Sequence, residues 1–251
     1  MLRRRFQACG HFVVSVDLLP ADDKPRFGKL GGHIRGDLFQ TFWRFHNAGV
    51  VFDLGIFHPD CTYLTSSAEW AYADPNFVRY PGVGYHQKVK PGTLTGAKRR
   101  AARKKALGVV LDITKLPIKR KAIENPKGAI TKITPVKREV LEPCYIQIVQ
   151  PHAFGDNASK GTVLMLINLR PLQLGGQRAK PRMVCRGCGA VYAFEKMPVR
   201  CICGKMSKQF ASRYDNQTDS EQNNLTPGGK RWKQRARTYP GIADAMVERW
   251  G

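Results

Sequence analysis

Three observations predict a mixed α/β fold for this chain. Two short apolar runs, residues 51–57 and 118–123, each end at a turn that contains proline, as buried strands commonly do. Between them, the stretch from Ala101 to Ile113 has the apolar spacing of a helix. Hydrophobic residues make up 42% of the 251 residues, which is enough for a core and argues against wholesale disorder.

The two apolar runs deliver one thiol and one carboxylate. The first run leads into His58-Pro59-Asp60-Cys61-Thr62-Tyr63-Leu64, and the second ends at Glu124-Asn125-Pro126. In an open α/β sheet, the loops at the carboxyl ends of strands line the ligand crevice. A Cys and a Glu placed there suit covalent catalysis on an electron-poor ring, in which the thiolate adds and the carboxyl group handles the proton. The alternative is that Glu124 is a solvent-facing loop residue.

The helix predicted from Ala101 to Ile113 begins in a basic tract, 98–105. We expect its apolar residues to pack inward and its cations to face water. A solvated helix face is the simpler interpretation, and a contact with a DNA backbone is the rival. The preceding segment, 80–85, is predicted to be a mobile loop because of its Pro and Gly residues.

Four of the seven cysteines form a CxxC and a CxC pair, each followed by glycine (Gly189 and Gly204). This spacing predicts a structural zinc ribbon or knuckle, with residues 190–194 as one of its strands and with these metal ligands: Cys185, Cys188, Cys201 and Cys203. Two disulfides are the alternative, which a reducing cytosol disfavours. Cys9 and Cys144 are expected to be ordinary core thiols.

Charge favours a nucleic-acid partner. The chain has 42 Lys+Arg against 19 Asp+Glu, a formal net charge of +23, and release of phosphate counterions drives such proteins onto polyanions. A ribosome-associated or merely basic protein is the alternative. Basic and aromatic residues surround the zinc motif, which suits DNA contacts; a structural clip is the simpler role. No segment approaches the roughly 20 apolar residues of a membrane span, and no secretory signal is visible, so we expect a cytoplasmic protein of a bacterial host.

The Cys and Glu motifs together resemble those of DNA cytosine-C5 methyltransferases, specifically the phage and prophage branch. Four further segments are similar to the family's and come in the same order. Residues 10–20 are similar to the family's second strand, and residues 33–37 are similar to the end of its next strand. Residues 150–155 are similar to a later segment of the family, and residues 237–246 are similar to its closing helix. The likeness covers residues 1 to about 172 and 231 to 250. It implies a Rossmann-like, doubly wound methyltransferase sheet with an inserted zinc ribbon.

The resemblance also implies the partners and the roles of site residues. Cys61 attacks a flipped cytosine of double-stranded DNA, Glu124 is the acid, and Asn125 shapes its loop. The cofactor is S-adenosylmethionine, with Asp17 on its ribose, Asp37 near its adenine and Thr238 closing the site. The remaining residues of the implied cofactor site are Leu18, Leu38 and Pro59. The alternative for Asp17 and Asp37 is that they only cap turns.

Two departures from the family pattern bear on activity. The family opens with a strand and a glycine-containing loop that holds the methionine part of the cofactor, whereas this chain begins with what resembles the following helix. We therefore expect a sheet without that central strand, in a truncated or mis-started product, a decayed enzyme, or one that obtains the strand elsewhere. The second departure is Asp60, in the position of the family's proline. A carboxylate beside Cys61 disfavours the thiolate and loosens the loop.

These observations predict four segments. They are a catalytic domain over 1–174, a zinc-ribbon insertion over 175–214, a flexible linker over 215–229 and a C-terminal helix over 230–251. The leading hypothesis is an active methyltransferase that serves phage modification against host restriction. A truncated or inactive methyltransferase-like DNA-binding protein of a phage or prophage is the second. An enzyme of the same fold that acts on another nucleobase substrate is the third.

Overall fold

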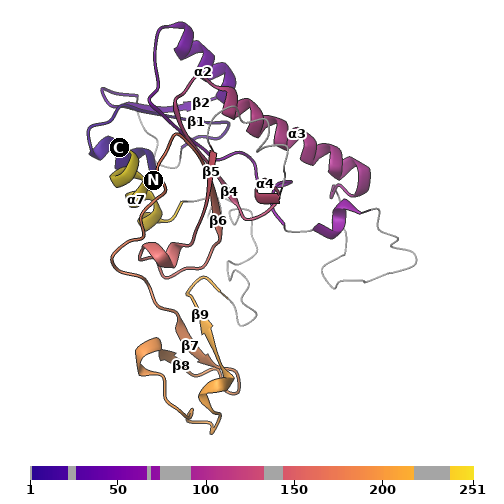
Figure 1. Cartoon of the computed structure of the whole chain (residues 1–251), viewed down its shortest axis with the longest axis vertical. Helices are drawn as coiled ribbons and strands as arrows, with labels where there is room; N and C mark the ends of the chain where they lie inside the picture. Colours follow the sequence, from indigo (N-terminus) through magenta and orange to yellow (C-terminus); the bar gives the residue numbers. More distant parts are fainter. Residues whose placement is uncertain (1, 22–26, 67–68, 74–91, 133–143, 218–237) are drawn as a thin grey trace. The chain divides into compact units, whose positions relative to one another are not determined.

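The computed structural model describes residues 2–21, 27–66, 69–73, 92–132, 144–217 and 238–251 (Figure 1). The chain divides into two compact units, each built from separate stretches of sequence. One unit holds Phe52–Ile148 and Gly161–Pro171, and is called the sheet unit below. The other holds Met1–Val51, Val149–Lys160 and Leu172–Gly251, and is called the ribbon unit.

The sheet unit contains a mixed four-stranded sheet with the order β3-β4-β6-β5. Strands β3 (Leu54–Phe57) and β4 (Arg120–Pro126) are parallel, whereas β4 and β6 (Thr162–Ile167) are antiparallel. Strand β5 (Cys144–Val149) is the other edge. The remaining described elements of the unit are α3 (Gly96–Lys115), α4 (Ala129–Lys132) and the 3-10 helix η1 (Glu69–Tyr72).

Its core lies on the two central strands. All six residues of β6 are buried, as are residues 121–125 of β4. Continuous burial of this kind belongs to strands that are covered on both faces. Lys121 is 2% exposed, and it is accommodated because its Nζ donates to the carbonyl of Leu116 at 2.9 Å.

The ribbon unit begins with α1 (Leu2–Ala8), which packs against β1 (Val13–Asp17). Strand β1 pairs in parallel with β2 (Gly31–Arg35), and α2 (Leu38–Asn47) follows. Gly31 has a φ of +85° and faces the backbone carbonyl of Val13 where a Cβ would stand, so glycine is required at this start of β2.

The C-terminal helix α7 (Pro240–Trp250) packs against α1 and against the 3-10 helix η2 (Pro151–Phe154). Its buried face consists of Ile242, Ala243, Met246 and Trp250. Pro240 occupies the first turn, where its missing N–H costs nothing. The next N–H, that of Gly241, donates to the carboxylate of Asp156 at 2.9 Å.

The third sheet, also in the ribbon unit, has three antiparallel strands with the order β8-β7-β9 (Figure 1). They are β7 (Arg182–Cys185), β8 (Val191–Ala193) and β9 (Phe210–Arg213), with the short 3-10 helices η3 (Phe194–Lys196) and η4 (Ser207–Gln209) between them. The strand predicted at 190–194 is confirmed.

The mixed α/β class is confirmed. The strand predicted at 51–57 exists from Leu54, and the helix at 101–113 lies inside α3. The second run forms a longer strand than predicted, because β4 continues through Pro126 and places Glu124 within it. A single doubly wound methyltransferase sheet stays a prediction, since the strands described form separate sheets.

Two sequence predictions are wrong. Cys9 is exposed rather than a core thiol, and Cys144 is only partly buried. The predicted linker starts too early, because Asp215 forms an ion pair with Arg182 and Asn216 donates to Ser159. Residues 218–229 of that linker and the loop predicted at 80–85 lie outside the described residues. None of the helices described has the length and apolar character to cross a membrane.

Candidate active site and metal centre

The carboxylate of Glu124 is buried at the end of the central strands. Glu124 is 7% exposed, so it is not the solvent-facing loop residue of the alternative interpretation. The register of β3 and β4 pairs Phe57 with Ile123. The residues that follow this pair in the chain, His58 and Glu124, therefore lie side by side. The His58 imidazole Nδ1 contacts Glu124 Oε2 as a hydrogen bond or ion pair. A buried carboxylate requires such a polar partner.

The loop that carries Cys61 leaves β3 at this same edge and turns at once. Asp60 Oδ1 accepts from the backbone N–H of Thr62 at 2.9 Å and from its hydroxyl at 2.6 Å. The Cys61 carbonyl accepts from the N–H groups of Leu64 and Thr65, which closes a helical turn. The thiol is partly exposed. Asp60 therefore has a local structural role in the position where the family has proline.

Asn125 holds the other side of the loop. It is 1% exposed, and its Nδ2 donates to the carbonyl of Pro59 at 3.3 Å. Its Oδ1 is buried without a protein partner. The amide thus ties the end of β4 to the segment just before the candidate nucleophile.

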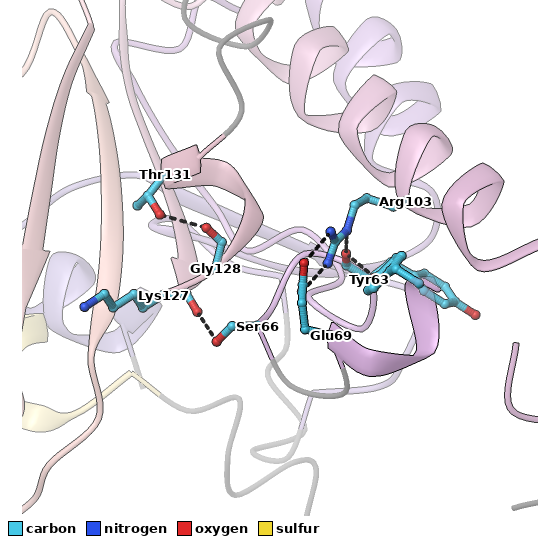
Figure 2. Close-up of polar contacts among 8 residues, drawn as sticks. Tyr63, Ser66, Glu69, Arg103, Lys127, Gly128 and Thr131 are labelled. Atoms are coloured by element: carbon cyan, nitrogen blue, oxygen red, sulfur yellow. Dashed lines mark hydrogen bonds and ion pairs between the residues drawn. The ribbon is translucent and has the colours of Figure 1, made fainter. Parts of the chain in front are cut away.

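Beyond Cys61, the chain is anchored against the residues that follow β4 (Figure 2). Leu64 is fully buried, and its carbonyl accepts from the N–H of Ala129 at 2.6 Å. Thr65 and Gly128 form a β-bridge, and a Cβ at Gly128 would overlap the Leu64 carbonyl. Glycine at 128 therefore permits the close backbone approach that fixes the loop.

Arg103 of α3 binds the same loop from a different element (Figure 2). Its Nε donates to the Tyr63 carbonyl at 2.9 Å, and its two terminal nitrogens donate to the Glu69 carboxylate at 3.1 and 2.9 Å. The guanidinium also lies 3.4 Å from the centroid of the Tyr72 ring. The hydrogen bond to Glu69 is the main reason that the pKa of Arg103 is raised above its ordinary value.

Arg103 and Arg99 correct the prediction that the cations of 98–105 face water. Arg99 is 6% exposed and lies 4.7 Å from the centroid of the Tyr72 ring. The sequence held a signal for this. Arg99, Arg103, Val110 and Ile113 are separated by four, seven and three residues, so they lie on one face of α3. Arg99, Val110 and Ile113 are buried on that face. Their planar guanidinium groups pack on aromatic rings, which the charge count alone did not suggest.

All the residues predicted to bind the cofactor belong to the ribbon unit, except Pro59, which belongs to the sheet unit. Asp17 ends β1, is exposed, and accepts from the N–H of Leu19 through Oδ1 at 2.9 Å. Asp37 is the N-cap of α2 and accepts from the N–H of Gln40 at 2.9 Å. Both carboxylates thus cap turns, as the alternative interpretation holds.

The other predicted cofactor residues take three positions. Leu18 is 69% exposed, and its carbonyl accepts from Arg35 Nε. Leu38 is the first residue of α2, and Thr238 is partly buried two residues before α7. Pro59, Cys61, Glu124 and Asn125 belong to the sheet unit.

The four predicted zinc ligands converge. Their Sγ atoms lie within 4.8 Å of one another, and two of the separations are 3.6 Å (Cys185–Cys203) and 3.5 Å (Cys188–Cys201). A tetrahedron with Zn–S bonds of about 2.3 Å has edges of about 3.8 Å. All four cysteines are free thiols, which disagrees with the two-disulfide alternative. The cluster is suited to a metal ion such as zinc.

Hydrogen-bond donors lie beside two of the cluster's sulfur atoms. The N–H of Gly187 donates to Cys185 Sγ, and the Tyr192 hydroxyl lies 3.2 Å from Cys201 Sγ. The backbone N–H of Cys203 and then the Tyr192 hydroxyl lower the pKa of Cys201 to about 6. Tyr192 stacks on Phe210 at 5.5 Å, which fixes the ring that carries this hydroxyl.

Sequence reasoning did not assign roles to His58 and Arg103. His58 was visible as the first residue after a predicted strand, in the motif that carries Cys61, but nothing in the sequence indicated which residue of β4 it would meet. The chain matches no protein-family model and no curated protein. The resemblance to DNA cytosine-C5 methyltransferases therefore depends on the sequence motifs alone.

Proposed function

We propose that this protein is an S-adenosylmethionine-dependent DNA cytosine-C5 methyltransferase. One observation carries the proposal: Glu124 is buried on β4 beside the end of β3, and the loop of Cys61 leaves that same edge. A hydrogen-bonded carboxyl group at the strand edge from which a loop with a partly exposed thiol leaves suits addition of that thiol to a pyrimidine ring.

The target cytosine must leave the helix, because its C6 is not accessible to a thiolate while it is stacked. Cys61 Sγ forms a bond to C6 while Glu124 donates a hydrogen bond or proton at N3, so the electrons displaced from the C5–C6 double bond make C5 nucleophilic. S-adenosylmethionine would supply the methyl group that C5 takes up, and its S–CH3 bond would break to leave S-adenosylhomocysteine. Loss of the C5 proton to a base then restores the double bond and breaks the Sγ–C6 bond.

The residues of the ribbon unit offer part of a cofactor site. One oxygen of Asp17 caps its turn, and the residue remains exposed at the end of a parallel strand, where nucleotide-binding sheets hold a ribose. Asp37, Leu18, Leu38 and Thr238 of the same unit are proposed to complete the site.

Double-stranded DNA is the proposed partner, since the chain carries a net charge of +23 and its zinc ribbon, from Arg182 to Arg213, has seven basic residues against one acidic residue. Zinc held by Cys185, Cys188, Cys201 and Cys203 would fix the fold of the ribbon.

The test is to incubate zinc-loaded protein with S-adenosylmethionine and unmethylated duplex DNA of diverse sequence, and to quantify 5-methyldeoxycytidine by mass spectrometry. The wild-type protein should produce it. Cys61→Ser should abolish it, and Cys9→Ser, which removes an exposed thiol elsewhere, should not. The absence of product from the wild type, at conditions where cofactor and DNA both bind, contradicts the proposal.

A second candidate is a methyltransferase-like protein that binds DNA without transferring a methyl group. The capping contacts of Asp17 and Asp37 favour it, because each carboxylate already has a structural role. Calorimetric titration with S-adenosylmethionine separates the two: micromolar one-to-one binding supports the enzyme, and no binding supports the second candidate.

A further inference from the structure

The zinc ribbon carries a hairpin-like segment, Val199–Met206, called the knuckle below. The N–H of Cys201 donates to the carbonyl of Lys205 at 2.8 Å, and the N–H of Ser207 donates to the carbonyl of Val199 at 2.9 Å. Gly204 turns the chain with a φ of +85°. Two metal ligands lie within the knuckle, so zinc would fix its shape.

The knuckle presents apolar side chains to solvent. Ile202, between the ligands Cys201 and Cys203, is 89% exposed, and Val199 is 73% exposed. Met206 is 37% exposed at the other end. Exposed aliphatic groups that gather on one short turn and are flanked by polar residues are the kind of surface that marks interaction sites.

Cations alternate with these apolar groups. Arg200 and Lys205 are both exposed and flank Ile202, and neither has a carboxylate partner among the residues that the structure describes. The aliphatic stem of Lys205 lies over Gly187, which directs its position. From Arg182 to Arg213 the chain has seven basic residues and one acidic residue, Glu195, which pairs with Lys180 at 2.8 Å.

We propose that the knuckle is a DNA-docking element, in which Ile202 enters a groove of the duplex and Arg200 and Lys205 bind the flanking phosphates. Aliphatic side chains contact thymine methyl groups in the major groove or wedge between base steps in the minor groove. Cations on either side then hold the register of the protein on the backbone. This inference shares the DNA partner of the proposed function, but it does not require methyl transfer.

The experiment measures the affinity of the full-length, zinc-loaded protein for a fluorescent DNA duplex over a range of salt concentrations. Each phosphate contact contributes about −0.9 to the slope of log K against log salt. Arg200→Gln and Lys205→Gln should therefore each make the slope shallower by about 0.9. Ile202→Ser should weaken binding roughly tenfold and leave the slope unchanged, because it removes an apolar contact.

Matched controls separate the knuckle from general charge and hydrophobicity. Lys119→Gln removes an exposed cation elsewhere, and Val51→Ser removes an apolar side chain that is 78% exposed. Both should bind as the wild type does. One zinc per chain in every variant shows that the ribbon is folded. Knuckle variants that bind DNA like the controls would overturn the inference, as would Ile202-dependent binding to anionic lipid vesicles with no effect on DNA.

The two proposals fail separately. If methylation occurs but the knuckle variants keep the wild-type affinity and slope, the knuckle inference is wrong and the enzyme remains. If no methylation is found but the slope changes as predicted, the knuckle inference stands and the second candidate function gains.

Discussion

His58 Nδ1 contacts Glu124 Oε2, although the two residues are 66 positions apart in the chain. The parallel register of β3 and β4 brings them together, since it pairs the residues just before them, Phe57 and Ile123. Glu124 is buried and His58 is 39% exposed at its side chain, so the imidazole lies between the buried carboxylate and solvent. This placement lets His58 orient the carboxylate.

We expect Glu124→Gln to lower the methylation rate by at least about 100-fold, because an amide keeps the shape of the carboxyl group but cannot transfer a proton. His58→Gln, which retains a hydrogen-bond donor, should lower kcat less and leave KM for DNA near its original value. Steady-state methylation rates at varied DNA concentrations give both kcat and KM. A Glu124→Gln protein with an undiminished rate would remove Glu124 from the mechanism.

His58→Ala should also affect stability. It deletes a polar partner of a buried carboxylate, which costs on the order of 1–3 kcal/mol of unfolding free energy. Urea denaturation of His58→Ala and His58→Gln distinguishes this effect from catalysis, because the Gln variant should lose less stability than the Ala variant.

Zinc removal should unfold the ribbon selectively. Among the described residues, the buried core around the cluster consists of Cys185, Cys201 and Phe210, with Met183, Ala190 and Tyr192 packed against it, and this core is too small to be stable without the metal. We expect one zinc per chain by elemental analysis. A chelator, or Cys201→Ser, should abolish it, and proteolysis should then cut within 182–213 first. Cys144→Ser is the matched control and should retain the metal.

Gly241→Ala should destabilise the ribbon unit. A Cβ at this position would overlap the backbone carbonyl of Phe154, and a backbone atom cannot move aside as a flexible side chain can. Overpacking of this kind costs about 1–3 kcal/mol. Gly108→Ala is the control, because its Cβ would meet nothing within 4 Å in the middle of α3, where Ala favours the helix. Thermal unfolding should show opposite shifts for the two variants.

The sequence predicted the elements that depend on local pattern. The strand before Cys61, the helix α3 and the four-cysteine cluster all follow from apolar periodicity or ligand spacing. It did not predict pairings that depend on register, such as His58 with Glu124, because register is set when the strands pair in three dimensions. It also misjudged Arg99 and Arg103, since aromatic rings from a distant segment accept these cations in a buried stripe.

We expect the ribbon unit to lose stability in acid because of His152. His152 stacks on Tyr214 at 4.6 Å, and its pKa is lowered from the ordinary 6.5, mainly by desolvation and secondarily by the charge of Arg178. The folded state therefore binds a proton less readily than the unfolded state does. Above pH 6.5 the titration of His152 does not lower the free energy of unfolding. Below pH 6.5 the unfolded state takes up the proton first, so the free energy of unfolding falls until His152 is protonated in the folded state as well.

His152→Phe preserves the ring stack on Tyr214 and removes the titration. Between about pH 7.5 and about pH 5.5, the urea midpoint of this variant should fall less than that of the wild type. Arg178→Gln should give an intermediate result, because it removes only the electrostatic cause of the lowered pKa. Other titrating groups are common to all three proteins, so the difference between their midpoints isolates His152. Equal losses in the wild type and His152→Phe would show that His152 titrates alike in the folded and unfolded states.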